Sequence, residues 1–242
     1  MGVNAEGILD ETIRTYGLLS KRYTRKPWPI IYKVIDENVR TVCDIGCGVG
    51  QNTIDICVRY KHVRVCCLDL SWEMAEMAYR RLKKRRLSHR VLVIQADMRA
   101  LPFRDNVFDS ILYIASLHNL PTKKGRVNAL KEGYKVLRNK GKMLVTCWAR
   151  EQLLFFPKIL INLFKKILGF KGLESIGDVI ITTKIRDREY RRFYHLYTRK
   201  ELHNDVVNAG FTVLEEGIYI HGRPGVLKPN KNHYIVAEKS IQ

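Results

Sequence analysis

The sequence predicts a doubly wound α/β fold, in which a mostly parallel seven-stranded sheet carries helices on both faces and an inserted helical segment. Three observations lead to this prediction. Short apolar runs alternate with amphipathic segments at the spacing of strand–helix–strand units. A glycine-rich turn follows the first run, and acidic residues follow the next two. The length of 242 residues suits one domain of this kind.

The order of the expected elements supports this class. After an N-terminal helical segment, five strands are expected at Thr41–Ile45, Val63–Asp69, Val91–Ala96, Phe108–Ala115 and Lys142–Trp148. Helices are expected between them at Asn52–Tyr60, directly after Ser71, and at Lys124–Leu137. Ser71 is a favoured N-cap residue, and Lys83–Arg86 places cations where a helix C-terminus stabilises them.

The alternation stops at Glu151–Tyr197, which we interpret as an insertion with its own helix. Thr198 and Glu201 then form a capping-box signature for a helix that Gly210 ends. Two last strands are expected at Phe211–Tyr219 and His233–Glu238. We therefore expect a single domain with an N-terminal helical cap (residues 1–40), a core (41–150), the insertion (151–197) and a C-terminal helix and strands (198–242).

The charge is strongly basic and unevenly distributed. The chain has 43 Lys and Arg against 24 Asp and Glu, a formal net charge of +19 at pH 7. Of the basic residues, 27 lie in four stretches, Lys21–Lys33, Tyr79–Arg90, Lys123–Lys142 and Lys184–Lys200. Solvated helix faces, or the ion pairs of a thermophilic protein, are the alternative explanation of these basic stretches. Thermophilic proteins, however, are enriched in charged residues of both signs, and Tyr79–Arg90 contains no acidic residue. The pattern favours an anionic partner, nucleic acid before an acidic membrane or substrate.

Several protein classes are disfavoured. The longest apolar stretch, Leu153–Phe164, contains Pro157 and Lys158 and is shorter than the roughly 20 residues that span a bilayer. The N-terminus shows no signal-peptide pattern, so we expect a cytoplasmic protein without stable membrane insertion. The six cysteines form no C-x-x-C pair, so no metal site is expected.

A ligand crevice is predicted where the first three strands end. The turn DIGCGVG (Asp44–Gly50) has glycines that permit a tight turn and a close backbone approach to a ligand. Asp69 ends the second strand, where a carboxylate can accept hydrogen bonds from ribose hydroxyls, and Asp97 ends the third. Each acid alone could be a helix N-cap. Together they indicate a nucleoside site at the carboxyl edge of the sheet.

Asp44–Gly50, Asp69, Asp97 and the strand FDSIL (Phe108–Leu112) together resemble the class I S-adenosylmethionine-dependent methyltransferases, over Val42–Trp148 and the C-terminal strands. The resemblance implies S-adenosylmethionine as the cofactor. It implies that Gly46, Cys47 and Gly48 face its methionine part, Asp69 the ribose, and Asp97 and Met98 the adenine. The full set of implied cofactor residues is Asp44, Gly46, Cys47, Gly48, Asp69, Leu70, Asp97, Met98 and Ala115.

Three peripheral motifs bear on the substrate. TRKPWP (Thr24–Pro29) places cations beside Trp28, His118 follows the fourth strand, and RRFYHLY (Arg191–Tyr197) interleaves arginines with aromatics. Arginines and aromatics together can bind phosphates and stack bases, although core packing, a structural histidine and a half-buried strand also account for them. With LVTCWAREQ (Leu144–Gln152), these motifs resemble the tRNA wobble-uridine 5-carboxymethyl methyltransferases of eukaryotes and archaea.

This second resemblance implies methyl transfer to the carboxylate of 5-carboxymethyluridine in a tRNA anticodon stem-loop, which gives the methyl ester. A carboxylate is already ionised at neutral pH, so no general base is needed and the protein must position an anion with cations or donors. The implied catalytic residues are Arg25, His118 and Arg192. The implied substrate-binding residues are Lys26, Trp28, Tyr194 and His195.

The family also implies a partner, a small zinc-binding activator subunit that pairs near Val91–Ile94, although a buried strand would have the same pattern. The main alternative function is a small-molecule methyltransferase acting on a quinone or lipid-like substrate at a membrane surface. Leu153–Phe170, an apolar stretch with scattered lysines, supports that alternative. A third reading is a catalytically silent RNA-binding module, which requires that the chain bind no cofactor.

Overall fold

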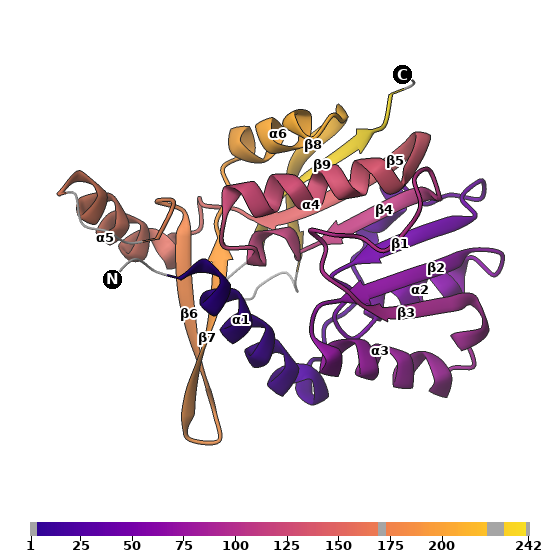
Figure 1. Ribbon diagram of the computed structural model, residues 1–242, viewed down its shortest axis with the longest axis horizontal. Coiled ribbons are helices and arrows are strands. Elements are labelled where there is room, and N and C mark those ends of the chain that lie inside the picture. Colours follow the sequence, from indigo (N-terminus) through magenta and orange to yellow (C-terminus); the bar gives the residue numbers. More distant parts are fainter. Residues whose placement is uncertain (1–3, 169–172, 222–229, 241–242) are drawn as a thin grey trace.

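The computed structural model describes residues 4–168, 173–221 and 230–240. Its centre is a seven-stranded sheet in the order β3-β2-β1-β4-β5-β9-β8 (Figure 1). The strands are β1 (Thr41–Ile45), β2 (Arg64–Asp69), β3 (Val91–Gln95), β4 (Phe108–Ile114), β5 (Leu137–Trp148), β8 (Thr212–His221) and β9 (Asn230–Glu238). The first five are parallel, and β9 pairs antiparallel with β5 and β8. The predicted fold class is confirmed.

Helices cover both faces of this sheet. α2 (Gln51–Arg59) and α3 (Trp72–Lys84) bury apolar residues in one core, while α4 (Lys123–Val136) and α6 (Arg199–Asn208) pack into the core on the other face. Two predicted caps are present. The hydroxyl of Ser71 accepts a hydrogen bond from the Met74 amide, and that of Thr198 accepts one from the Glu201 amide. The strand and helix bounds agree with the sequence prediction within a few residues, except that β5 starts at Leu137.

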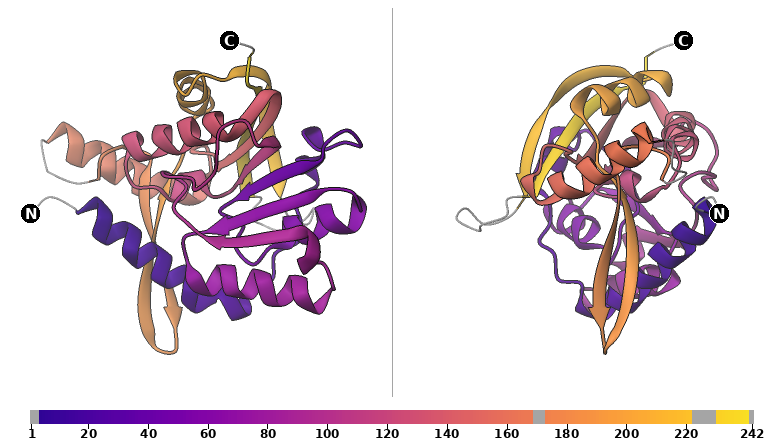
Figure 2. Two further views of the ribbon diagram at one scale, coloured as in Figure 1. Left: turned by 45° about the vertical axis from the view of Figure 1, so that its right-hand side comes forward. Right: turned by 90° about the vertical axis from the view of Figure 1, so that its left-hand side faces the viewer.

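The N-terminal segment contributes α1 (Ala5–Leu19), which runs between α3 and the hairpin formed by β6 (Asp178–Ile185) and β7 (Arg188–His195) (Figures 1 and 2). Hydrogen bonds tie α1 to β7. The hydroxyl of Thr15 donates to the Arg191 carbonyl over 2.9 Å, and the Phe193 amide donates to the Thr12 hydroxyl over 2.9 Å. α1 is therefore fixed to a strand that lies far away in the sequence.

The insertion is only partly helical. It contains α5 (Phe156–Ile167), but most of its second half is the β6–β7 hairpin, which forms a separate two-stranded sheet and extends beyond the body of the molecule (Figure 2). The motif RRFYHLY lies largely on β7. Its strand alternation is hard to see in the sequence, because charged and aromatic residues stand on both faces.

Candidate active site

A pocket opens at the carboxyl ends of β1, β2 and β4 and against α1, with about 900 Å³ of empty volume, its open mouth included. Its lining from the sheet includes Gly46, Cys47, Gly48, Asp69, Leu70, Asp97, Met98 and Ala115. Its lining from the N-terminal segment includes Leu9, Thr12, Ile13, Tyr16, Tyr23, Arg25 and Trp28. Eight of the nine expected cofactor residues therefore meet in one cavity, together with α1 residues that the sequence did not indicate.

The glycine turn after β1 shapes the floor of the pocket. Gly46 has φ +74°, and a Cβ atom there would lie 2.4 Å from Cβ of Ser116. Its amide and that of Cys47 donate to the Leu68 carbonyl, over 2.8 and 2.9 Å. Only glycine combines this φ with so close an approach, so the turn brings bare backbone to the surface of the cavity.

Asp69 stands at the end of β2 beside this turn. One carboxylate oxygen accepts from the Gly48 amide over 2.9 Å and the other from the Ser71 amide over 3.0 Å. Burial raises the pKa of Asp69 to about 6 although these amides oppose the change. An ionised carboxylate has about four lone-pair sites, so it retains capacity to accept hydrogen bonds from a ribose diol in the pocket.

Asp97, at the end of the next strand, has a cationic partner that the sequence analysis missed. Arg99 donates to both Asp97 carboxylate oxygens, with Nη2 at 2.8 Å from Oδ2, and its Nη1 lies 2.8 Å from Oε1 of Glu6 on α1. The pair Asp97–Arg99 therefore links the cofactor end of the pocket to the start of α1. An arginine two residues after the acid was the available sequence signal.

Asp44 lies behind the turn instead of in the lining. It is 1% exposed, and the Thr53 hydroxyl donates to it over 2.8 Å. Burial raises its pKa to about 6. The structure thus gives Asp44 the role of holding β1 to α2 below the glycine turn, and brings it into no contact with the cavity.

Two arginines and two tyrosines meet where α1 approaches β7. The Tyr16 and Tyr194 hydroxyl oxygens are 2.9 Å apart, and the Arg192 guanidinium carbon lies 5.3 Å and 5.6 Å from the centres of their rings. Arg25 lines the pocket, with its guanidinium carbon 5.2 Å from the ring centre of Tyr23. Burial raises the pKa of Tyr23 to about 12, so this phenol remains a neutral donor.

Arg192 holds unused donor capacity. Its Nη2 donates to the Thr183 hydroxyl over 3.0 Å, while its buried Nε has no hydrogen-bond partner among the described residues. A buried guanidinium nitrogen without a partner is costly. An anion that reaches this corner would satisfy it, which makes the corner formed by Arg25 and Arg192 the candidate substrate site.

His118 lies behind this corner, on a short turn (Leu117–Asn119) after β4. It is 1% exposed, and its Nδ1 accepts from the Trp148 amide over 3.1 Å. Burial, helped by Arg25, lowers its pKa to about 3. The ring is therefore neutral with its proton on Nε2, and it packs 5.5 Å from the ring of Tyr194. His118 can donate a hydrogen bond but supplies no positive charge.

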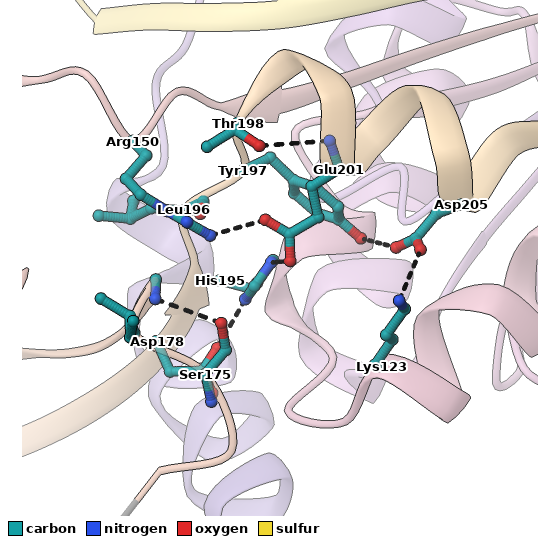
Figure 3. Close-up of polar contacts among 12 residues, drawn as sticks. Lys123, Arg150, Ser175, Asp178, His195, Leu196, Tyr197, Thr198, Glu201 and Asp205 are labelled. Atoms are coloured by element: carbon teal, nitrogen blue, oxygen red, sulfur yellow. Dashed lines mark hydrogen bonds and ion pairs between the residues drawn. The ribbon is translucent and has the colours of Figure 1, made fainter. Parts of the chain in front are cut away.

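His195 does not join the substrate corner. It is fully buried, with Nδ1 2.6 Å from an Asp178 oxygen and Nε2 2.9 Å from a Glu201 oxygen (Figure 3). Arg150 pairs with the other Glu201 oxygen over 2.6 Å. Although burial opposes it, the hydrogen bond from His195 lowers the pKa of Glu201 to about 2. Side chains alternate along a strand, so His195 faces away from Arg192 and Tyr194 and fastens β6, β7 and α6 together.

The residues of the TRKPWP motif also lie in different environments. Trp28 is 2% exposed and lines the pocket, its amide donates to the Asn52 side chain over 2.9 Å, and its ring lies 5.6 Å from that of Tyr219. Lys26 is exposed and does not line the cavity. Within the described residues, no group of three or more His, Cys, Asp or Glu could hold a metal ion.

These features define a class I S-adenosylmethionine-dependent methyltransferase. A family model for a methyltransferase domain matches residues 42–141. A solved S-adenosylmethionine-dependent methyltransferase from Methanosarcina mazei superposes with a TM-score of 0.74 at 20% identity, covering 90% of this chain and all of that one. Enzyme class and cofactor are thus as expected. The pocket fits the cofactor, because the glycine turn leaves room for close approach and Asp69 can accept from its ribose.

Within this class, the chain is similar to tRNA methyltransferases. It is 26% identical to the tRNA (carboxymethyluridine(34)-5-O)-methyltransferase of Schizosaccharomyces pombe, over 89% of each chain. It is 28% identical to a protein of Encephalitozoon cuniculi described as a methyltransferase, over 86% of this chain and 87% of that one. A demethylmenaquinone methyltransferase of Porphyromonas gingivalis is 31% identical over 43% of this chain and 42% of its own length.

Proposed function

We propose that this methyltransferase esterifies the carboxylate of 5-carboxymethyluridine at the wobble position of a tRNA. The observation that carries the proposal is the position of Arg192 over the tyrosine pair Tyr16–Tyr194, next to Arg25 and Tyr16 in the lining of the cofactor pocket. Two permanent cations at the edge of a cavity suit an anionic acceptor. The sequence similarity to the fission yeast enzyme points to the same acceptor.

The residues divide the task in a simple way. S-adenosylmethionine, when bound at the glycine turn, supplies a methyl group activated for uptake by a nucleophile. Arg25 and Arg192 orient the substrate carboxylate, and the hydroxyls of Tyr16 and Tyr194 offer further hydrogen bonds. The carboxylate is ionised at neutral pH, so no side chain has to remove a proton, which agrees with a His118 that is buried, neutral and engaged at Nδ1.

The arrangement of basic residues supports an RNA substrate. Arg81 on α3 donates to the Tyr23 carbonyl over 3.0 Å, so the basic end of α3 and the segment Lys21–Lys26 lie on one surface. The exposed basic residues on this surface include Lys21, Arg22, Lys26, Arg80, Lys83, Lys84, Arg85 and Arg86. Tyr23 and Arg25, in and next to the same segment, line the pocket, so this basic surface adjoins the pocket and suits a phosphate backbone. The basic stretch on α4 lies on the opposite face of the sheet.

The decisive test is incubation with S-adenosylmethionine and tRNA that carries 5-carboxymethyluridine, followed by nucleoside mass spectrometry. We expect a gain of one methyl group on this nucleoside, removable by alkali as an ester is. Transfer to another nucleoside would reassign the substrate, and cofactor binding without transfer to any tRNA would overturn the proposal.

A quinone or lipid-like acceptor is the second candidate function. The menaquinone relative and the apolar helix α5 favour it. Arg25 and Arg192 count against it, because a neutral quinone leaves their charges without a partner. Methylation of a demethylated quinone in vesicles, with none of tRNA, would establish this candidate instead.

We also propose that the activator subunit pairs with β3. β3 is an edge strand of the seven-stranded sheet, and Leu92 on it is 58% exposed. An edge strand offers unpaired backbone groups to a partner strand. Ile218 on the opposite edge strand, β8, is equally exposed and provides a matched control.

The test of this pairing uses Leu92→Glu and Ile218→Glu, each co-expressed with the activator subunit. We expect the first to abolish co-purification of the activator and the second to leave it intact. Retention of the activator by both variants would contradict pairing at β3.

A further inference from the structure

Helix α5 turns its polar side toward the protein and its apolar side toward solvent. Its contacts with the body come from Ile159, from Lys158, which donates to the Ile180 carbonyl over 2.6 Å, and from Asn162, which donates to the Asp178 carbonyl over 2.7 Å. On the other side lies a stripe with helical spacing, Phe156, Leu160, Leu163, Phe164 and Ile167. These side chains are 38% to 70% exposed.

This orientation is the reverse of that in the other helices of the domain. α3 buries Ala75, Ala78 and Leu82 against the sheet and presents its charges outward. Ile161 and Leu168 widen the α5 stripe, at 53% and 68% exposed. A contiguous apolar surface of this kind on a folded domain marks a site that another molecule covers.

The charge around the stripe indicates what covers it. α5 contains no acidic residue, and among its described side chains Lys158 and Lys166 are exposed, although Lys158 also donates to the Ile180 carbonyl. A second copy of the chain on the stripe would bring these lysines together with no acid opposite them, which disfavours self-association. An anionic lipid surface meets both requirements, because its acyl region takes up the apolar stripe and its headgroups attract the lysines.

We infer that α5 is an interfacial helix that binds the protein to an anionic membrane surface. The helix has 12 residues and is about 18 Å long, so it lies in the plane of the interface and does not cross the bilayer. No helix among the described residues is long and apolar enough to cross a membrane. α5 lies at the periphery of the molecule (Figures 1 and 2), and the side chains of its stripe are exposed.

The inference is independent of the proposed acceptor, since none of the stripe residues lines the pocket. Phe155, just before the helix, stacks on Trp148 at 5.7 Å, and Trp148 stacks on Tyr194 at 4.4 Å. Test substitutions are therefore placed in the second half of α5, away from this aromatic stack.

The experiment measures co-sedimentation of the full chain with phosphatidylcholine vesicles that contain or lack phosphatidylserine. We expect binding to the vesicles with phosphatidylserine, and at least about a tenfold lower partition coefficient for Phe164→Glu and for Ile167→Glu. Val58→Glu on α2 is the matched control, because Val58 is 62% exposed and the charge change is the same. It should bind as the unaltered protein does, and all three variants should keep their affinity for S-adenosylmethionine.

Two results would overturn the inference. One is absence of binding to vesicles with phosphatidylserine, or equal loss in Val58→Glu and the α5 variants. The other is a stable dimer of the unaltered protein that Phe164→Glu dissociates, which would assign the stripe to a second copy of the chain.

Discussion

The pocket has two walls of different construction. The cofactor wall (Gly46, Gly48, Asp69 and Asp97) comes from turns that end neighbouring parallel strands, and its ligand groups are backbone and carboxylates. The proposed substrate wall (Tyr16, Arg25, Arg192 and Tyr194) joins α1 to β7, across 178 residues of sequence between the two tyrosines. Tyr16 and Arg25 line the pocket, Arg192 and Tyr194 contact Tyr16, and the groups that this wall offers are long side chains. The first wall depends on local conformation and the second on tertiary packing. Substitutions in the cofactor wall and in the substrate wall should therefore have different effects.

The largest effect is expected from the cations of the substrate wall. Arg25→Ala or Arg192→Ala should lower kcat/KM for tRNA methylation about a thousandfold, because each removes a charge that orients the acceptor carboxylate. The affinity for S-adenosylmethionine, measured by calorimetry, should change little. Arg188→Ala is the control, because Arg188 is an exposed arginine at the start of the same strand, near the hairpin turn and away from α1. Unchanged turnover in both Arg25→Ala and Arg192→Ala would show that the substrate wall takes no part in the reaction.

The cofactor wall should respond through backbone conformation. Gly46→Ala forces a Cβ to within 2.4 Å of Ser116 at positive φ, so we expect a loss of about 3 kcal/mol in the free energy of unfolding. Gly48→Ala shares the positive φ but meets nothing closer than 3.9 Å, and should cost about 1 kcal/mol. Urea denaturation without ligand measures both. Equal losses would mean that close packing at Ser116 contributes nothing.

The pKa of Asp69 gives the cofactor wall a dependence on pH. The value of about 6 lies above the unfolded value, so the native state takes up a proton first and this carboxyl adds stability as pH falls from about 6 to about 4. Cofactor affinity runs the opposite way, because the ribose contact needs the ionised form and weakens below about pH 6. Calorimetric titrations across this range check it. Asp69→Asn should bind more weakly, by roughly tenfold, with this pH dependence reduced.

The smallest effect is expected where α1 is tied to β7. Thr15→Val keeps the shape of the side chain but removes the hydrogen bond to the Arg191 carbonyl, at a cost of about 1 kcal/mol in stability. The KM for tRNA should rise severalfold with an unchanged cofactor Kd. Thr182→Val, at an exposed position on the hairpin, should leave both constants unaltered. The same KM in both variants would show that the hydrogen bond from Thr15 to Arg191 does not position the substrate wall.

The contrast between the cofactor wall and the substrate wall also explains which features could be predicted from the sequence. The strands, the glycine turn and Asp69 follow from short-range rules, since apolar runs form parallel strands and those strands end at one edge. An N-terminal helical cap was expected, but its contacts with β7 were not, because they depend on residues over 170 positions away. The prediction that His195 binds the substrate was wrong, because the motif RRFYHLY contains residues that face the candidate substrate site and residues that hold the fold together. Only the register of β7 shows which residues lie on which face of the strand.

The position of α1 has a thermodynamic consequence. The helix lines the cofactor pocket with Leu9, Thr12 and Ile13, and the same helix presents Tyr16 to Tyr194 on β7. A displacement of this one element alters both ligand sites at once. If occupancy of one site displaces α1, it shifts the affinity of the other site, and by linkage the two shifts are the same factor. Measured in both directions, that factor reports how strongly α1 couples the cofactor site to the proposed substrate site.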